Sequence, residues 1–392
     1  MINNKKKYIA KNILKMPTSG IRKFFDVVNT MDNVISLGVG EPDFETPWYV
    51  REEAIRSIEK GKTSYTSNQG MIELRKSISE YLLEKYNLNY DSEKEVLVTV
   101  GASEGIDIAL RTICEVGDEI LVVEPSYVSY KPCIIMAGGV PITITTTEKN
   151  DFRLKLSDIK KKITDRTKAI IMSYPNNPTG AIMEKKDLEE IAKILIEKDI
   201  IVISDEIYSE LTYGRNHISI ASIEGMRERT IVLNGFSKSF AMTGWRLGYV
   251  VAPEIFVEQM IKIHQYIIMC APTMSQFAAL EALKNQEREE SIDIMRDSYD
   301  ERRRIMLKAF RSMGLYCFEP LGAFYLFPCI KSTGFTSEEF CEKLLYEQNV
   351  AVVPGTAFGE CGEGFVRCSY AYSLDIINEA ISRIENFMKK IE

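Results

Sequence analysis

The chain has 392 residues, which is long for a single hydrophobic core, so we expect two structural units. Apolar residues make up 45% and charged residues 27% of it, as in ordinary globular proteins, and the net charge of −7 argues against a nucleic-acid partner. The apolar runs fall short of the roughly 18 residues that span a bilayer, and the opening MINNKKKYIAKNILKM is too polar for a signal peptide.

Short apolar runs in the middle of the chain predict strands that are buried on both faces, as in a parallel sheet covered by helices. These runs lie at residues 96–100, 119–123, 169–173, 200–204, 230–233 and 247–251. The segment at residues 140–146 alternates instead and predicts a half-buried or edge strand. Between two of the runs, residues 187–199 carry the apolar spacing of an amphipathic helix, with Leu188, Ile191, Ala192 and Leu195 on one face. The alternation of strands and helices predicts an α/β architecture.

The residue pattern of the sequence changes after about residue 275, from short apolar runs to a long charged segment. Residues 279–314 predict one long, highly charged helix that ends at Gly314, and its charges predict a solvated face. Strand-like pieces at residues 322–328, 349–355 and 364–371 and a final helix from Leu374 predict a second, smaller α+β unit. We expect an N-terminal segment that belongs with the small domain, a large domain, and a small C-terminal domain, at residues 1–46, 47–285 and 286–392.

Lys238 lies among small residues in NGFSKSFAMTGWRLGY, between Asp205 in VISDEIYSE and Arg246. Pyridoxal 5'-phosphate chemistry requires such a set: a lysine that holds the aldehyde as a Schiff base, a carboxylate beside the pyridine nitrogen, and a positive fork for the phosphate. We expect desolvation and nearby cations to lower the pKa of Lys238 from about 10.4. Ser237 would complete the phosphate site with Arg246. A lysine after a strand usually lies on the surface, but few have both an acid and an arginine at these spacings.

Other motifs also follow strands, and ligands of open parallel sheets bind beyond the carboxyl ends of the strands. In TVGASEG, the amides of Ala102, Ser103 and Glu104 would open a helix and suit a phosphate, although a tight turn with a Ser cap explains the motif equally well alone. In YPNNPTG, Asn177 would face the phenolic oxygen of the cofactor, and a simple turn is the alternative. Tyr208 follows Asp205 into the same crevice.

The cysteines and histidines carry no catalytic or metal pattern. None of the eight cysteines forms a CxxC pair, and the two histidines, His217 and His264, are far apart. We therefore expect reduced thiols in a cytoplasmic protein without membrane partners, structural histidines, and no metal site.

The chain resembles the class I/II aminotransferases of pyridoxal-phosphate fold type I over essentially its whole length. Within them it is most similar to the bacterial and archaeal aspartate aminotransferases, and among these to aminotransferase A-like enzymes linked to N-acetyl-diaminopimelate. The landmarks occur in the order of the family: LGVGEPDFETP, SYTSNQG, GASEG, PNNPTG, SDEIYSELTY, the Lys238 segment, PLGAFYLF, VVPGTAFG and VRCSYA. The resemblance implies a mostly parallel central sheet flanked by helices in the large domain.

The resemblance also implies residue roles. Tyr127 would stack on the cofactor ring, where this branch often has Trp. The ring would contact Asn177, Asp205 and Tyr208, and the phosphate would contact Ser103, Ser237 and Arg246. Arg367, with Gly40 and Asn177, would bind the α-carboxylate of the substrate. Tyr65 would reach the cofactor phosphate of the neighbouring subunit, which implies a homodimer with shared active sites. Arg22 would lie over the site and pair with a distal carboxylate, or it is an ordinary surface arginine.

The favoured function is ping-pong transamination from an L-amino acid, with 2-oxoglutarate as the expected acceptor. Lys238 would act as general base and acid, with Asp205 and Tyr208 supporting the ring. The same residues serve a carbon–sulfur β-lyase, which is the main alternative. A non-catalytic regulator that binds the cofactor is a further alternative, but the residues before Asn33 are too few for a DNA-binding domain.

Overall fold

The structure is a computed structural model that describes residues 6–16, 31 and 33–391. Arg22 lies outside the described residues. A seven-stranded sheet forms the centre of the larger unit, with the strand order β2-β8-β7-β6-β5-β3-β4. Its strands are β2 (Val96–Thr99), β3 (Glu119–Glu124), β4 (Val140–Thr145), β5 (Thr167–Ser173), β6 (Ile201–Asp205), β7 (Thr230–Gly235) and β8 (Gly248–Val251).

All neighbouring strands of this sheet are parallel except where β8 pairs with β7 and β2. Each of the six apolar runs forms one of its strands, and β4 lies at the edge, so the sequence predictions for the sheet are confirmed. The predicted mostly parallel sheet flanked by helices is therefore present.

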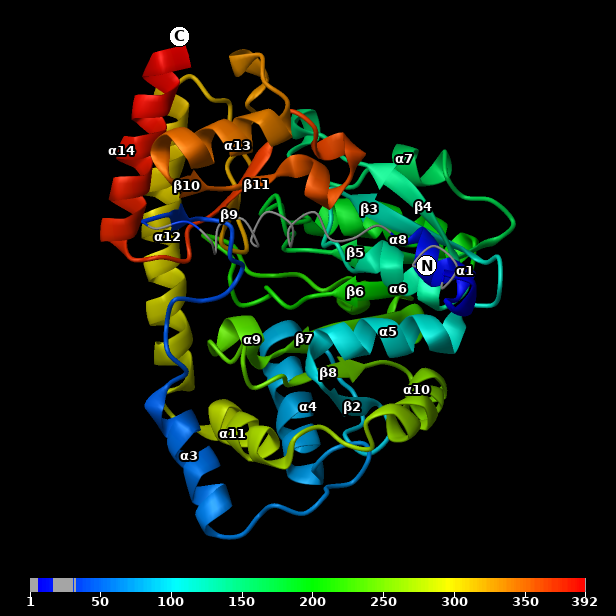
Figure 1. Cartoon of the computed structure of the whole chain (residues 1–392). Helices are drawn as coiled ribbons and strands as arrows, with labels where there is room; N and C mark the ends of the chain where they lie inside the picture. Colours follow the sequence, from blue (N-terminus) through cyan, green and yellow to red (C-terminus); the bar gives the residue numbers. More distant parts are fainter. Residues whose placement is uncertain (1–5, 17–30, 32, 392) are drawn as a thin grey trace.

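Helices cover both faces of the sheet (Figure 1). They are α3 (Trp48–Glu59), α4 (Ile72–Tyr86), α5 (Gly101–Ile113), α6 (Tyr130–Met136), α7 (Leu156–Lys160), α8 (Lys185–Glu197), α9 (Phe236–Ser239), α10 (Glu254–Ile267) and α11 (Thr273–Lys284), and a short helix, α1 (Lys11–Lys15), precedes them. Successive side chains of a strand point to opposite faces, so Ile120 and Val122 pack with α5, α6 and α10, whereas Leu121 and Val123 pack on the side of α8. The predicted apolar stripe of α8 is buried.

The long helix predicted at residues 279–314 is instead two helices, α11 and α12 (Arg288–Ser312). The chain is extended at Asn285, which ends α11. The Asn285 side chain accepts a 2.9 Å hydrogen bond from the amide of Glu287 and donates one of 2.7 Å to Glu281. Asparagine side chains compete with the helical backbone in this way, and periodicity alone does not detect it. The predicted end at Gly314 agrees with the left-handed φ of 77° there.

The smaller unit combines short strands with long helices. Its elements are β1 (Ile35–Ser36), β9 (Tyr325–Leu326), β10 (Val350–Ala351), β11 (Val353–Pro354), β12 (Val366–Ser369), α13 (Ser337–Gln348) and α14 (Leu374–Ile391). β11, β12 and β9 form an antiparallel sheet, and β1 pairs in parallel with β10. Leu37 joins the same apolar core as α12, α13 and α14. Residues 35–37 therefore pack with the smaller unit, whereas α1 lies beside α6 of the larger unit, so the described parts of the N-terminal segment do not all belong with the small domain.

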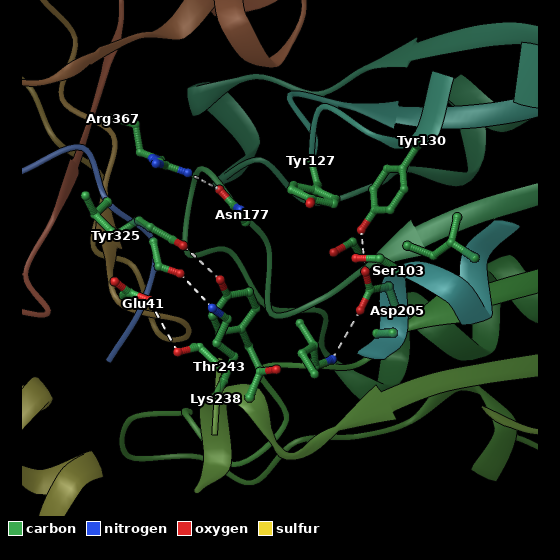
Figure 2. Close-up of a pocket in the computed structure, with 18 of the residues that line it drawn as sticks. Glu41, Ser103, Tyr127, Tyr130, Asn177, Asp205, Lys238, Thr243, Tyr325 and Arg367 are labelled. Atoms are coloured by element: carbon green, nitrogen blue, oxygen red, sulfur yellow. Dashed lines mark hydrogen bonds between the residues drawn. The ribbon is translucent and has the colours of Figure 1, made fainter. Parts of the chain in front are cut away.

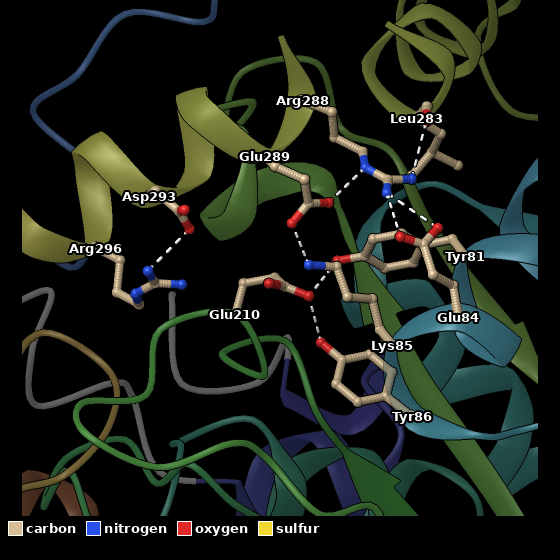
Figure 3. A network of polar contacts seen from close by, with 10 residues as sticks. All are labelled: Tyr81, Glu84, Lys85, Tyr86, Glu210, Leu283, Arg288, Glu289, Asp293 and Arg296. Atoms are coloured by element: carbon tan, nitrogen blue, oxygen red, sulfur yellow. Dashed lines mark hydrogen bonds and ion pairs between the residues drawn. The ribbon is translucent and has the colours of Figure 1, made fainter. Parts of the chain in front are cut away.

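Polar contacts attach the start of α12 to α4 of the larger unit (Figure 3). Arg288 pairs with Glu84 at 2.9 Å and with Glu289 at 2.8 Å, and Lys85 also pairs with Glu289. Further along the same helix, Met306 and Phe310 lie in the core of the smaller unit. α12 therefore connects the two units. Within the described part of the chain, no helix is both long and apolar enough to cross a membrane.

Candidate active site

A cavity of about 540 Å³ opens beyond the carboxyl ends of the parallel strands, where β9 and β12 face the large sheet (Figure 2). It brings together residues that are far apart in the sequence. The predicted site residues that line it are Gly40, Ala102, Ser103, Tyr127, Asn177, Asp205, Tyr208, Ser237, Lys238, Arg246 and Arg367. Two predicted residues, Glu104 and Tyr65, do not line it.

Asp205 ends β6 at the cavity and is buried, with 5% of its surface exposed. Its Oδ2 accepts a 2.7 Å hydrogen bond from the hydroxyl of Tyr130, and its Oδ1 accepts one of 3.3 Å from the amide of Ile207. Burial raises the pKa of Asp205, and the hydrogen bonds from Tyr130 and Ile207 oppose that rise. The site thus holds a carboxylate in a dry place, which suits a cationic ring nitrogen.

Lys238 lies in the single turn α9, directly after β7, and its Nζ donates a 2.6 Å hydrogen bond to the carbonyl of Gly40. Burial lowers the pKa of Lys238 to about 8. This value of about 8 already includes the neighbouring charges: Arg367 and Arg246 also lower the pKa, whereas Glu41 and Asp205 raise it. The lowered pKa agrees with the effect predicted from the sequence. A much larger fraction of the amine is therefore neutral at neutral pH than for an ordinary lysine, and this neutral form is able to attack an aldehyde.

The first turn of α5 forms an anion site with Arg246. The amides of Gly101, Ala102 and Ser103 precede the first intrahelical hydrogen bond, so they are free for a ligand. Gly101 has a φ of +71°, and a Cβ there would lie 2.7 Å from Nη2 of Arg246. Only glycine allows this close approach. Arg246 itself adopts a φ of 50°, a backbone region that few residues other than glycine occupy.

The side chain of Glu104 lies outside this anion site. Its Oε2 accepts a 2.5 Å hydrogen bond from the amide of Val100, and its Oε1 lies 2.7 Å from Nδ1 of the buried His264. Glu104 therefore caps the helix that the sequence motif opens. The sequence shows the acid near the helix start but not the direction of its side chain.

Arg367 is buried on β12, with its guanidinium between two aromatic rings. The ring centres of Tyr325 and Phe358 lie 4.4 and 4.7 Å from its Cζ. Nη1 donates to Oδ1 of Asn177 at 2.8 Å, and Nη2 donates to the carbonyl of Gly38 at 2.5 Å. Its Nε is buried and has no acceptor among the described residues. A guanidinium that lines the cavity and is held by surrounding side chains suits a carboxylate ligand.

Nine of the residues that line the cavity were missed by the sequence analysis, and three of these nine have titratable side chains. Tyr130 follows Tyr127 by three residues in EPSYVSY, and Tyr325 lies in the motif GAFYLF. The hydroxyls of Tyr325 and Tyr208 lie 2.8 Å apart. Glu41 lies in LGVGEPDFETP. Glu41 and Tyr325 lie inside motifs that carry the family resemblance, but only the folded chain shows that these side chains enter the cavity.

The donors fit pyridoxal 5'-phosphate. A buried carboxylate, a lysine of lowered pKa and free helix amides beside an arginine lie in one cavity, as the ring nitrogen, aldehyde and phosphate of that cofactor require.

The remaining predicted site residue, Tyr65, is 80% exposed and does not line this cavity.

The chain matches a family model described as aminotransferase class I and II over residues 32–384. It is 48% identical to an aspartate aminotransferase of Pyrococcus abyssi over 373 residues, which is 95% of this chain and 96% of the relative. It is 44% identical to aromatic-amino-acid aminotransferase 2 of Thermococcus litoralis, over 95% of this chain and 96% of that protein. The crystal structure of an aromatic aminotransferase from Pyrococcus horikoshii superposes with a TM-score of 0.90 at 46% identity, covering 94% of this chain and 99% of that one.

Proposed function

The chain belongs to the class I and II aminotransferases, which use pyridoxal 5'-phosphate to transfer amino groups, and we propose that it carries an amino group from an L-amino acid to 2-oxoglutarate by a ping-pong reaction. The observation that carries the proposal is the single cavity in which Lys238, Asp205, Arg246 and Arg367 meet. The named relatives act on aspartate or on aromatic amino acids, so the family alone leaves the donor open.

Bound pyridoxal 5'-phosphate supplies an electron-withdrawing ring that stabilises the negative charge left on a deprotonated Cα. Asp205 would keep the ring nitrogen protonated by charge attraction, and Tyr130 would keep Asp205 ionised. For the remaining lining residues we propose the roles that the motifs and the family resemblance imply: Tyr127 at the ring face, Asn177 and Tyr208 at the phenolic oxygen, and Ala102, Ser103, Ser237 and Arg246 at the phosphate.

Arg367 would bind the α-carboxylate of the amino acid through a planar, charge-assisted pair of hydrogen bonds. The rings of Tyr325 and Phe358 hold its guanidinium plane in place. Asn177 and Gly40 lie beside it in the same cavity. A carboxylate fixed at this end determines which bond of Cα faces Lys238, and this orientation favours loss of the proton over loss of the carboxylate.

Lys238 would hold the cofactor as a Schiff base in the resting enzyme and become a free amine once the substrate takes its place. With a pKa of about 8, its Nζ can accept the Cα proton and return it to the C4' position. The neutral amine is needed for the first transfer and the ammonium for the second. A pKa near the working pH serves both.

We also propose that the enzyme is a homodimer with shared active sites. Tyr65 is highly exposed and outside its own cavity, and the nearby chain segments expose Tyr266, Ile267 and Met269. Exposed apolar residues that gather in this way mark interaction surfaces.

We further propose that the protein is cytoplasmic. All eight cysteines are free, which supports this proposal.

A half-reaction tests the proposed function. An L-amino acid donor, added without an oxo acid, is expected to remove the visible absorption of the bound cofactor with one equivalent of donor per site. Adding 2-oxoglutarate should restore the absorption and yield glutamate. Sustained release of ammonia and pyruvate from cystathionine, with no oxo acid present, would instead establish the β-lyase activity. Aspartate, phenylalanine and tyrosine are the first donors to compare.

A further inference from the structure

Five charged side chains line the cavity: the carboxylates Glu41 and Asp205 and the cations Lys238, Arg246 and Arg367. In the proposed function, three of them meet an opposite charge from a bound molecule. Asp205 faces the ring nitrogen, Arg246 faces the phosphate, and Arg367 faces the substrate carboxylate. Glu41 gains no such partner, and no cation among the described residues lies within ion-pair distance of it.

The backbone brings Glu41 close to the reactive lysine (Figure 2). The carbonyl of Gly40, the residue before Glu41, accepts the 2.6 Å hydrogen bond from Nζ of Lys238. The hydroxyl of Thr243 donates a 3.3 Å hydrogen bond to Oε2 of Glu41. Thr243 belongs to the loop that follows Lys238, so the Glu41 carboxylate is held at the same side of the cavity as the amine.

A second set of contacts fixes the two segments relative to each other. The hydroxyl of Thr46 donates a 2.7 Å hydrogen bond to the carbonyl of Ala241, and Nε1 of Trp245 donates one of 3.0 Å to the same hydroxyl. The segment that carries Glu41 is therefore attached at several points to the loop that follows Lys238. The charge of Glu41 acts on Lys238 from a defined position.

We propose that Glu41 is a positioning residue that sets the protonation of the Lys238 nitrogen during turnover. The inference rests on the proposed function and adds a residue to it. A negative charge stabilises the protonated form of a nearby amine, so Glu41 would delay loss of the proton that Lys238 must return to the C4' position. Burial and the two arginines already favour the neutral form of the amine. Without Glu41, a smaller fraction of Lys238 would therefore keep the proton that it must return.

The charges that face Lys238 agree with this role. Burial and the two arginines lower the pKa of Lys238, and Glu41 is the strongest of the charges that raise it. The rings of Tyr208 and Phe324 also face the amine, with centres 6.0 and 5.6 Å from Nζ. Glu41 is exposed to solvent, so its effect should be sensitive to salt.

The test is the pH titration of the visible absorption band in the resting holoenzyme of Glu41→Gln. Glutamine keeps the length of the side chain and an oxygen that accepts from Thr243, and it removes only the charge. We expect the titration midpoint to fall by about half a pH unit at low salt. The shift should shrink in about 1 M NaCl, where charges are screened within about 3 Å. An unchanged or higher midpoint at low salt would overturn the inference.

Two further variants separate charge from structure. Glu45→Gln removes a carboxylate of the same segment that pairs with Arg51 at 2.8 Å outside the cavity, so its midpoint should equal that of the wild type. Glu41→Asp keeps the charge and should stay closer to the wild type than Glu41→Gln. An equal shift in both Glu41 variants would mean that the charge is not the cause.

The failure of the proposed function would look different. If borohydride does not attach the cofactor to Lys238 in the wild-type protein, the proposed function is wrong, and the inference about Glu41 fails with it. If the cofactor is attached and the Glu41→Gln midpoint does not move, only the role of Glu41 is wrong.

Discussion

The hydroxyl of Tyr130 donates a 2.7 Å hydrogen bond to Oδ2 of Asp205, and both side chains are buried in the large domain. Tyr130 is the first residue of α6, whereas Asp205 ends β6, so two separate elements build this pair. Burial raises the pKa of Asp205 and the hydroxyl opposes the rise. The tyrosine therefore helps a dry carboxylate to stay ionised, which is the state that a protonated ring nitrogen needs.

Tyr130→Phe should weaken cofactor binding because Asp205 loses its strongest donor. The pKa of Asp205 would rise further, so a smaller fraction is ionised at low pH, and the loss of affinity should grow as the pH falls. A hydrogen bond to a charged group contributes about 1.5–3 kcal/mol, which corresponds to roughly tenfold to a hundredfold in affinity. Fluorescence titration with pyridoxal 5'-phosphate at several pH values measures it. Tyr370→Phe, which loses a 3.1 Å bond to the carbonyl of Ala323, is the control and should bind normally.

Arg367→Lys should raise the KM for the amino acid donor, although it keeps the positive charge. Lysine cannot form the planar pair of hydrogen bonds or stack between Tyr325 and Phe358. We expect kcat/KM to fall by about a hundredfold, with cofactor binding little changed, since the proposed phosphate site is formed by other residues, Arg246 and the first turn of α5. Steady-state kinetics over a range of donor concentrations measures the fall. A variant with unchanged KM would place the carboxylate elsewhere.

The pKa of Lys238 predicts how its amine reacts in the cofactor-free protein. The neutral amine is the nucleophile, so acetylation of Lys238 should increase with pH and reach half of its plateau at about pH 8. At one pH unit lower, the rate should be about tenfold below the plateau. Peptide mass spectrometry after brief exposure to acetic anhydride gives the profile. A midpoint equal to that of the same peptide in the unfolded chain would show that burial does not affect the amine.

The proposed shared active site makes a prediction about mixed dimers. Tyr65→Ala and Lys238→Ala should each be inactive alone, because each removes a residue that every site in its homodimer needs. After subunit exchange, one site of each hybrid dimer has neither defect, so up to about one quarter of all sites should regain activity. Activity assays of the mixture against each variant alone measure it. Persistent inactivity despite confirmed hybrid formation would contradict the role of Tyr65.

Local pattern was sufficient for much of the molecule. Buried strands appear as apolar runs because both of their faces are covered. Such a run can be recognised in the sequence without knowing which strands and helices pack against it. The ends of these strands then bring Asn177, Asp205 and Lys238 to one edge, because parallel strands share a direction. The order of the motifs along the chain predicted the family, and the family match confirms it.

Other features depend on contacts between distant segments. The helix ends at Asn285 because hydrogen bonds of its side chain compete with the helical backbone. The Glu104 side chain points away from the anion site because it contacts the buried His264 of another helix. The sequence by itself determined the strands, the family and many of the residues that line the cavity, because these depend on local periodicity and motif order. Only the tertiary structure decided that Tyr130 reaches Asp205 and that Glu41 lies beside Lys238, because hydrogen bonding and electrostatic interaction depend on separation in space.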